Sequence, residues 1–156
     1  MALRRLVDAV QPSDRGSAVA AGLALLGLGP GLTPSGDDAL VGFLGAWRWL
    51  SPRALDDDIR RAMLGALVDR APSGTTSVSA EFFHHLFHGR VSEPLLQLFE
   101  ALIAGTQHDV QRAADRIAAW GASSGLDTLS GVHALLLAAR MAQLHVAPDK
   151  EEAAWD

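Results

Sequence analysis

The spacing of apolar residues predicts helices along nearly the whole chain. One stripe has positions i, i+3, i+4 and i+7, the spacing of a single helical face, and it consists of Leu40, Phe43, Leu44 and Trp47. Little of the sequence shows the period-two alternation of a half-buried strand. We therefore expect an all-α protein, a single compact bundle of about six to seven helices with glycine-rich polar loops at helix N-termini.

Glycine, proline and small polar residues divide this pattern into separate helices. Asp14 can cap a first helix that runs to about Leu28, and a glycine-rich loop then leads into the helix with the apolar stripe. Residues 71–79 have the turn chemistry of a loop. The other helices are expected at about 55–70, 79–88, 92–102, 106–120 and 126–145, and the charged tail 148–156 is expected to fray.

Composition excludes several classes of function. The chain has 156 residues, which fits a single domain over 1–156, and its net charge of -5 with scattered basic residues argues against a nucleic-acid partner. It contains no cysteine, so disulfides, zinc–thiolate sites and thiol catalysis are excluded. The most apolar stretch, residues 18–28, is too short to span a bilayer. We expect a cytoplasmic protein without membrane association.

Three polar breaks each stand just ahead of a predicted helix. They are Gly31–Asp38, Ser73–Ser79 and Ser123–Gly131. A helix N-terminus presents unpaired N–H groups and a partial positive charge, which suits phosphate, carboxylate or another oxyanion. If the three breaks meet in space, they form a polar pocket inside an apolar bundle.

The residue types in these breaks suggest which of them bind an anion. Glycines let the backbone approach a ligand closely, and hydroxyls add hydrogen-bond donors. The candidate binding residues are Gly29, Gly31, Thr33, Ser35, Gly36, Thr75, Thr76, Ser77, Ser124, Gly125 and Asp127. The alternative is that all three breaks are ordinary N-caps, where Ser, Thr and Asp are common. The first break has four polar side chains, and Pro30 and Pro34 make it rigid, which is more than a cap needs.

Asp37 and Asp38 are the candidate catalytic residues and candidate ligands of Mg²⁺. Mg²⁺ is commonly held by one or two carboxylates together with water and a substrate phosphate. Adjacent side chains on a helix point about 100° apart, so we expect one aspartate to face the ligand while the other caps or orients. Asp127 is a candidate third carboxylate. The alternative is that the acidic pair only favours the helix dipole.

Other features carry less functional information. His84 and His88 have the i, i+4 spacing of a metal-chelating pair, but the sequence offers no third ligand nearby. His133 follows the third break and is equally compatible with packing. The Gly-x-x-x-x-Gly-Lys-Ser/Thr motif is absent and no lysine precedes Lys150, which excludes a P-loop nucleotide site.

The segment Gly29-Pro-Gly-Leu-Thr-Pro-Ser-Gly-Asp-Asp38 resembles the signature of a bacterial family that includes the AllH-type subunit of oxamate carbamoyltransferase. Residues 75–79 and 124–131 resemble two further segments of that family, although the third often carries a histidine where this chain has Ala122. Relatives in that family are longer, and this chain resembles their C-terminal helical part. The resemblance implies a carbamoyl-transfer reaction that interconverts oxalurate plus phosphate with oxamate plus carbamoyl phosphate. It also implies partner subunits of FdrA type and AllG type.

Three functions are compatible with these patterns. The favoured one is a subunit of a carbamoyl- or phosphoryl-handling transferase that binds its oxyanion at the Gly29–Asp38 loop. The second is an Mg²⁺-dependent hydrolase similar to ADP-ribosylglycohydrolases, whose acidic motifs Asp37-Asp38 and Asp127-Thr128 loosely match. The third is a non-catalytic ligand-binding or assembly subunit. Glycine-lined helix faces also suggest a homo-oligomer.

Overall fold

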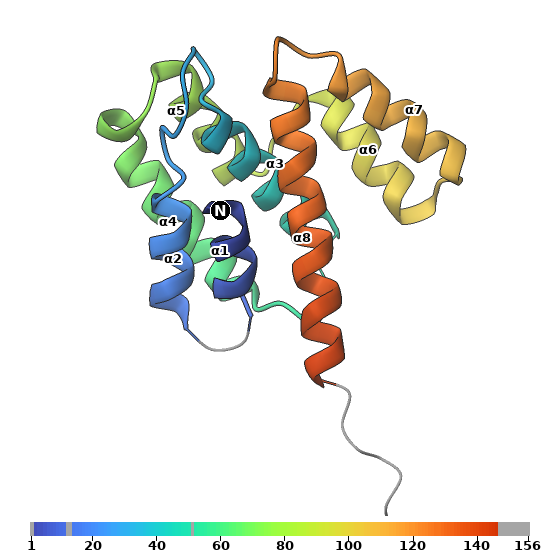
Figure 1. The fold of residues 1–156 in the computed structure, drawn as a ribbon, viewed down its shortest axis with the longest axis horizontal. Coiled ribbons are helices and arrows are strands. Elements are labelled where there is room, and N and C mark those ends of the chain that lie inside the picture. The colour runs from blue at the N-terminus through green and yellow to red at the C-terminus, as the bar shows by residue number, and fades with distance from the viewer. Residues whose placement is uncertain (1, 12–13, 51, 147–156) are drawn as a thin grey trace, which may run out of the picture.

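The computed structural model describes residues 2–11, 14–50 and 52–146, and all of the regular structure in these ranges is helical (Figure 1). This confirms the all-α class, with eight helices in the described residues where six to seven were expected. They are α1 (Ala2–Ala9), α2 (Arg15–Leu23), α3 (Ser35–Leu50), α4 (Asp57–Gly74), α5 (Ser77–Phe87), α6 (Glu93–Ala104), α7 (Gln107–Ala118) and α8 (Ser124–Val146). The prediction for the tail 148–156 lies outside the described residues.

Helices α3 and α8 form the centre of the bundle and pack against each other more extensively than any other pair of described helices. Their backbones come close because glycines stand at the crossing. A Cβ atom on Gly42 would collide with the carbonyl oxygen of Thr128, and one on Gly131 would collide with that of Ala39. This close approach sets the start of α8 beside the start of α3, where the polar loops lie.

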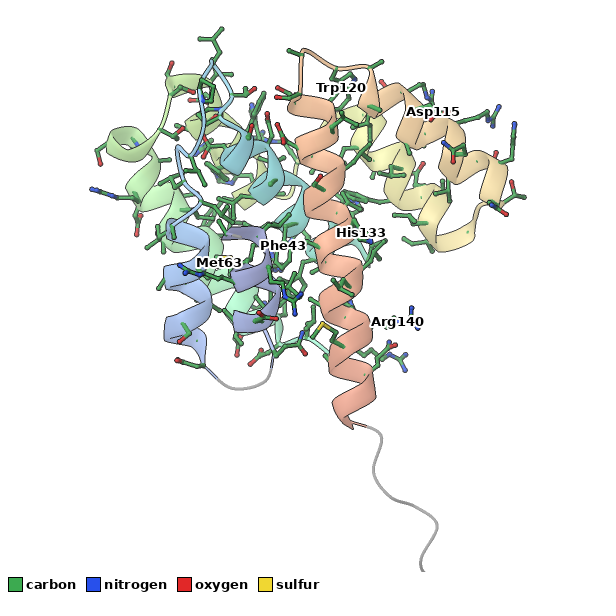
Figure 2. The ribbon with its side chains drawn as sticks, viewed as in Figure 1. Phe43, Met63, Asp115, Trp120, His133 and Arg140 are labelled. Atoms are coloured by element: carbon green, nitrogen blue, oxygen red, sulfur yellow. The ribbon has the colours of Figure 1, made fainter. Side chains whose placement is uncertain are left out.

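The remaining helices cover two sides of this central pair. In Figure 1, α1, α2, α4 and α5 lie on one side, and α6 and α7 lie on the other. The apolar stripe predicted for α3 faces the interior, where Phe43 and Trp47 meet edge to face with ring centroids 5.7 Å apart. Figure 2 shows Phe43 and Met63 within the bundle, whereas Asp115 and Arg140 lie on its outside.

The eighth helix is α1, which the sequence pattern did not indicate. An eight-residue helix is too short to be stable by itself, so its formation depends on tertiary packing. Leu6 and Val7 are buried, and the Gln11 side chain donates a hydrogen bond of 3.0 Å to the carbonyl of Ala138 in α8. The short segment becomes helical because α2 and α8 cover its apolar face.

The loop predicted for residues 71–79 is mostly helical, and that prediction was wrong. α4 continues to Gly74 with Pro72 inside its last turn, and α5 begins at Ser77, so only Thr75 and Thr76 are non-helical. Ala71 is fully buried, and this packing carries the helix past the point where local turn chemistry would end it.

Two other helix boundaries differ from the sequence expectation. α2 ends at Leu23 rather than near Leu28, because turns follow it and Gly27 adopts a left-handed φ of 70°. α8 begins at Ser124, two residues before the expected Leu126. The polar residues of the third break therefore lie within the first two turns of a helix instead of in a loop.

Candidate functional site

The three polar breaks converge at one end of the bundle, where α3, α5 and α8 begin (Figure 1). The hydroxyls of Thr33 and Ser124 lie 2.8 Å apart and share a hydrogen bond, which joins the first break to the third. The Thr76 hydroxyl donates a 2.6 Å hydrogen bond to the carbonyl of Leu32, which joins the first break to the second. The α2–α3 loop is thus held between the other two segments.

Glycine and proline determine the path of the α2–α3 loop. Gly27, Gly29 and Gly31 have φ values of 70°, 117° and 101°, a region that residues with a Cβ atom rarely adopt. The chain then turns back, so that the Gly36 N–H donates to the carbonyl of Leu28 at 2.8 Å. The N–H groups of residues 37 and 38 donate to the carbonyl of Pro34 at 2.9 and 3.1 Å. These first-turn N–H groups of α3 are already bonded within the loop.

Asp37 joins the α2–α3 loop to the α4–α5 junction. Its side chain is fully buried, and it accepts a 2.7 Å hydrogen bond from the Gly27 N–H and a second hydrogen bond from the Thr75 hydroxyl. One carboxylate oxygen takes part in each bond, so both oxygens are used. A Cβ atom on Gly27 would also collide with the carbonyl of Gly74, so this contact requires glycine. The geometry makes Asp37 a clamp between two segments.

Asp38 faces the opposite side and lacks such partners. It is 6% exposed, and its buried Oδ2 has no hydrogen-bond partner among the described residues. Burial raises the pKa of this carboxyl, the hydroxyls of Ser124 and Thr33 oppose the increase, and the carboxylates of Asp127 and Asp37 add to it. A buried carboxyl with an unused oxygen and a raised pKa is typical of a functional group rather than of a cap.

Asp127 lies in the first turn of α8, close enough to Asp38 for their charges to interact. Its Oδ2 is also buried without a hydrogen-bond partner. Within the described ranges, no three acidic or histidine side chains gather closely enough to hold a metal ion. Asp127 and Asp38 therefore interact as two charges, whereas the clamp residue Asp37 uses both of its oxygens in hydrogen bonds.

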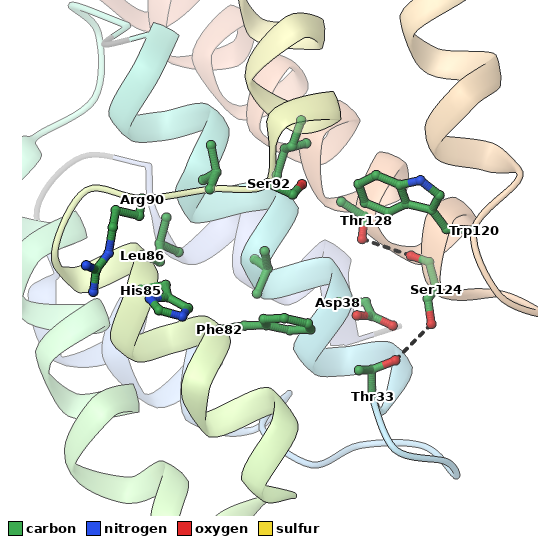
Figure 3. Close-up of a pocket in the computed structure, with 13 residues that line it drawn as sticks. Thr33, Asp38, Phe82, His85, Leu86, Arg90, Ser92, Trp120, Ser124 and Thr128 are labelled. Atoms are coloured by element: carbon green, nitrogen blue, oxygen red, sulfur yellow. Dashed lines mark hydrogen bonds between the residues drawn. The ribbon is translucent and has the colours of Figure 1, made fainter.

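A cavity of about 480 Å³ opens beside Asp38 (Figure 3). Asp38, Thr33, Ser124 and Thr128 lie at one end, Phe82 lies in the middle, and His85 and Arg90 lie at the other end. The cavity is lined by residues from three stretches of the chain, namely Thr33, Asp38, Val41, Phe82, His85, Leu86, Arg90, Val91, Ser92, Leu95, Trp120, Ser124 and Thr128. It has polar ends and an apolar middle.

The structure brings together only part of the predicted residue set at this cavity. Of the proposed catalytic and binding residues, the cavity is lined by Thr33, Asp38 and Ser124. Gly29 and Gly31 are exposed on the loop, whereas Gly36 and Gly125 are buried in close backbone contacts with the carbonyls of Leu25 and Ile117. The other members lie outside its lining: Ser35, Asp37, Thr75, Thr76, Ser77 and Asp127.

The second break acts as a support for the first. Thr76 caps α5 by accepting a hydrogen bond of 3.1 Å from the Ser79 N–H, and its hydroxyl also holds Leu32. Thr75 donates to Asp37. The capping interpretation therefore describes the second break well, with the addition that both threonines anchor the α2–α3 loop.

Several lining residues were not singled out from the sequence as site residues. His85 lines the cavity, whereas the i, i+4 pair His84 and His88 lies outside the lining with its rings 4.6 Å apart. The signal was available in the helical period, because Phe82, His85 and Leu86 are at i, i+3 and i+4 and share one face of α5. Arg90 lies in the α5–α6 connection and has no comparable local signal.

The fold and the site define an all-helical protein with a polar-ended cavity where three helices begin. The chain belongs to the AllH family, because the model of that family, described as oxamate carbamoyltransferase subunit AllH, matches residues 25–136. The match runs from the α2–α3 loop into α8 and includes every residue of the cavity lining. No solved structure matches the chain. In the described residues, no helix has the length and apolar character needed to cross a bilayer.

Proposed function

We propose that this chain is a subunit of a carbamoyl- or phosphoryl-handling enzyme similar to oxamate carbamoyltransferase, and that it binds its small anionic substrate in the Asp38 cavity. The observation that carries the proposal is the buried Oδ2 of Asp38, which lacks a hydrogen-bond partner at the edge of a cavity. Leaving a buried polar atom unpaired costs about 1–3 kcal/mol. A ligand that completes this hydrogen bond would recover that free energy.

The groups around Asp38 suit a carbamoyl or phosphoryl group. A carbamoyl –NH₂ offers two N–H donors to the carboxylate, and its carbonyl oxygen accepts from hydroxyls such as those of Thr33 and Ser124. Because its pKa is raised, the Asp38 carboxyl also keeps its proton to higher pH than an ordinary aspartate. In the protonated form it can donate to an oxyanion, and in the ionised form it can accept a proton.

The oxyanion contact in this proposal comes from side chains and from the start of α8. The N–H groups of residues 36–38 in the first turn of α3 are bonded within the loop, so the Thr33 and Ser124 hydroxyls are the proposed donors on that side. The partial positive charge at the N-terminus of α8, where Ser124 is the first residue, adds to their effect. Preorganised donors of this kind stabilise negative charge that develops during transfer.

Mg²⁺ enters this proposal as a counter-charge for Asp38 and Asp127. Both residues have a buried carboxylate oxygen without a hydrogen-bond partner, and Mg²⁺ is often bound by two carboxylates together with substrate oxygens. We expect Mg²⁺ to increase the affinity for carbamoyl phosphate in the wild type and to have no effect in Asp127→Asn. Release of ADP-ribose from a model substrate in the presence of Mg²⁺ would favour the hydrolase alternative instead.

The proposal includes partner subunits, of FdrA-like and AllG-like type, and a cytoplasmic location. Large exposed apolar residues near the Asp38 end of the cavity support docking of a partner there. Leu32 is 75% exposed and directly precedes Thr33, and Leu126 is 57% exposed near Ser124. Exposed apolar clusters commonly mark protein interfaces or homo-oligomer contacts. Co-purification of co-expressed partner chains with the wild type, and its loss in Leu32→Glu, tests this part.

Calorimetry with carbamoyl phosphate, inorganic phosphate and oxamate tests the central proposal. We expect Asp38→Asn to weaken binding at least tenfold, because a charge-assisted hydrogen bond is about twice as strong as a neutral one. Asp115→Asn, an exposed position on α7, is the matched control and should bind as the wild type does. Absence of binding to the wild type, with co-purified partner chains supplied, would contradict the proposal. Full complex activity in Asp38→Asn would favour the non-catalytic assembly role.

A further inference from the structure

The far end and the apolar middle of the cavity suggest what kind of molecule it accepts. We propose that the cavity selects an anion with an apolar body, whose charged group pairs with Arg90 and whose hydrogen-bonding group reaches Asp38. The inference rests on the proposed function in one respect, since it places the carbamoyl or other donor group of the ligand at the Asp38 end. It departs from oxamate as the ligand that fills the site.

The cavity is too large for oxamate or carbamoyl phosphate alone. Its volume is about 480 Å³. At roughly 30 Å³ for each non-hydrogen atom, the volume of one water molecule, oxamate with six such atoms occupies about 180 Å³ and carbamoyl phosphate with eight about 240 Å³. Either molecule alone would leave half or more of the cavity unfilled; the two together would occupy most of it, but neither has an apolar group to place against an apolar wall. Cavities of this size usually hold ligands with a larger body.

The unfilled part is apolar. Apart from Ser92, the rest of the lining is formed by apolar side chains from α3, α5, α6 and the segments that lead into α6 and α8, namely Val41, Phe82, Leu86, Val91, Leu95 and Trp120. Water in such a space finds few hydrogen-bond partners, and an apolar group of the ligand displaces it favourably. The wall therefore favours a hydrocarbon or aromatic body over a second polar group.

The far end is cationic. Arg90 lies beside His85 across Phe82 from Asp38 (Figure 3). In the described part of the chain, no acidic side chain forms an ion pair with Arg90. A guanidinium group presents paired donors that match carboxylate or phosphate oxygens. Arg90 is thus available to bind the anionic group of a ligand.

The separation of the two polar ends sets the shape of the ligand. In Figure 3, the ring of Phe82 lies between the Asp38 end and the Arg90 end. In oxamate the carboxylate is bonded directly to the amide carbon, so one molecule cannot contact both ends across this ring. A ligand that contacts both ends needs an apolar spacer or side group between its anionic group and its donor group.

A series of N-carbamoyl amino acids tests the inference on the full chain by calorimetry. N-carbamoylglycine, N-carbamoyl-4-aminobutyrate and N-carbamoyl-6-aminohexanoate keep the carboxylate and the carbamoyl group constant while the apolar spacer between them grows. We expect affinity to increase roughly fourfold for each methylene that becomes buried, and at least tenfold from the glycine to the aminohexanoate derivative. Phenyl phosphate, measured beside 3-phenylpropionate, distinguishes a phosphate from a carboxylate as the anionic group.

Two variants with matched controls assign the effect to the named residues. Arg90→Gln should weaken binding of the whole series at least tenfold, whereas Arg140→Gln, an exposed arginine on α8, should not. Phe82→Ala should remove the preference for the larger ligands and leave N-carbamoylglycine unchanged. Phe87→Ala is its control, since Phe87 is exposed on the same helix and lies outside the cavity lining. Thermal unfolding of each variant confirms that it is folded.

Each other outcome separates this inference from the proposed function. Equal affinity across the series, or tightest binding of N-carbamoylglycine, overturns the inference; if binding still depends on Asp38, the proposed function stands. If none of the series binds at millimolar concentration, the inference is also wrong. The proposed function then survives only if carbamoyl phosphate binds and Asp38→Asn weakens that binding.

Discussion

Asp37 and Asp38 are neighbours in the first turn of α3, both are buried, and they lie in opposite environments. The helical rotation of about 100° per residue directs Asp37 to the α4–α5 junction and Asp38 to the cavity. Asp37 has a donor for each oxygen, in Gly27 and Thr75, whereas Asp38 has an oxygen with none. The comparison shows that two carboxylates can be equally buried and still differ in whether each oxygen has a hydrogen-bond donor.

Mutations of Asp37 and of Asp38 should change the stability of the protein in opposite directions. Removing a satisfied buried carboxylate leaves its donors unpaired and destabilises the protein. Removing the charge from a buried carboxylate that lacks a hydrogen-bond donor relieves a desolvation cost and stabilises the protein, while any function that depends on that charge is lost. The following variants test this difference, from the largest expected effect to the smallest.

Asp37→Ala should have the largest effect on stability. It leaves the Gly27 N–H and the Thr75 hydroxyl without their acceptor, and each loss costs about 1–3 kcal/mol, so we expect a decrease of roughly 3 kcal/mol in the free energy of unfolding. Chemical denaturation measures it. Asp115→Ala, at an exposed position, should change stability by less than about 0.5 kcal/mol. Equal effects of the two variants would disprove the clamp role of Asp37.

Thr75→Val removes one half of the clamp at nearly constant volume. The Asp37 carboxylate keeps the Gly27 N–H but loses the hydroxyl, and a hydrogen bond to a charged group contributes about 1.5–3 kcal/mol. We expect a loss of about 2 kcal/mol by denaturation. In Asp37→Ala, the same Thr75→Val change should cost much less, because the bond is already absent. Additive losses would show that Thr75 acts through another contact.

Asp38→Asn should raise the free energy of unfolding at pH 7, by less than Asp37→Ala lowers it. Burial raises the pKa of Asp38 above its ordinary value of 3.8, so on increasing pH the unfolded chain loses this proton before the folded protein does. The wild type therefore loses stability from about pH 3.8 up to the folded pKa, and the Asn variant does not. Denaturation curves from pH 3 to pH 7 should show the difference grow with pH; a difference that is constant or falls with pH would contradict this assignment.

Ser124→Ala should have the smallest effect on stability and a visible effect on Asp38. The Thr33–Ser124 hydrogen bond is partly buried and neutral, so its loss should cost about 1 kcal/mol or less. The Ser124 hydroxyl lowers the pKa of Asp38, so its removal should raise that pKa further. An NMR titration of the Asp38 carboxyl carbon measures the shift, with Ser130→Ala, an exposed position on α8, as control. An unchanged pKa would show that the Ser124 hydroxyl does not interact with the Asp38 carboxyl.

The sequence predicts those features that depend on local pattern. The stripe at Leu40–Trp47 identified α3 because its period is helical, and the helix expected from about residue 106 is α7, which begins with a full capping box of Thr106 and Asp109. The expectation that the two adjacent aspartates diverge followed from helix geometry alone. Which of them faces the cavity depended on where α4, α5 and α8 pack, and local pattern carries no such information.

Features that depend on tertiary packing could not be predicted. α1 is helical because neighbouring helices bury Leu6 and Val7, and α4 continues through Pro72 because Ala71 is buried. The cavity as a whole combines His85 and Arg90 with residues some 50 positions earlier and 35 later in the chain, and no single segment shows that they share a space. Gly42 was expected to allow close approach on a helix face and Gly131 stood at the end of the third polar break, but the sequence did not show that both lie at the crossing of α3 and α8.

The contact between α3 and α8 also has a consequence for biosynthesis. Thr33 and Ser124, which share a hydrogen bond at the cavity, are 91 positions apart, and α8 is the last described helix to leave the ribosome. Until then the apolar face of α3 has no α8 to cover it, and long-range contacts of this kind form slowly. The apolar face of α3 is therefore uncovered by α8 for most of synthesis. We expect truncation before Ser124 to yield a product that aggregates instead of a smaller folded unit.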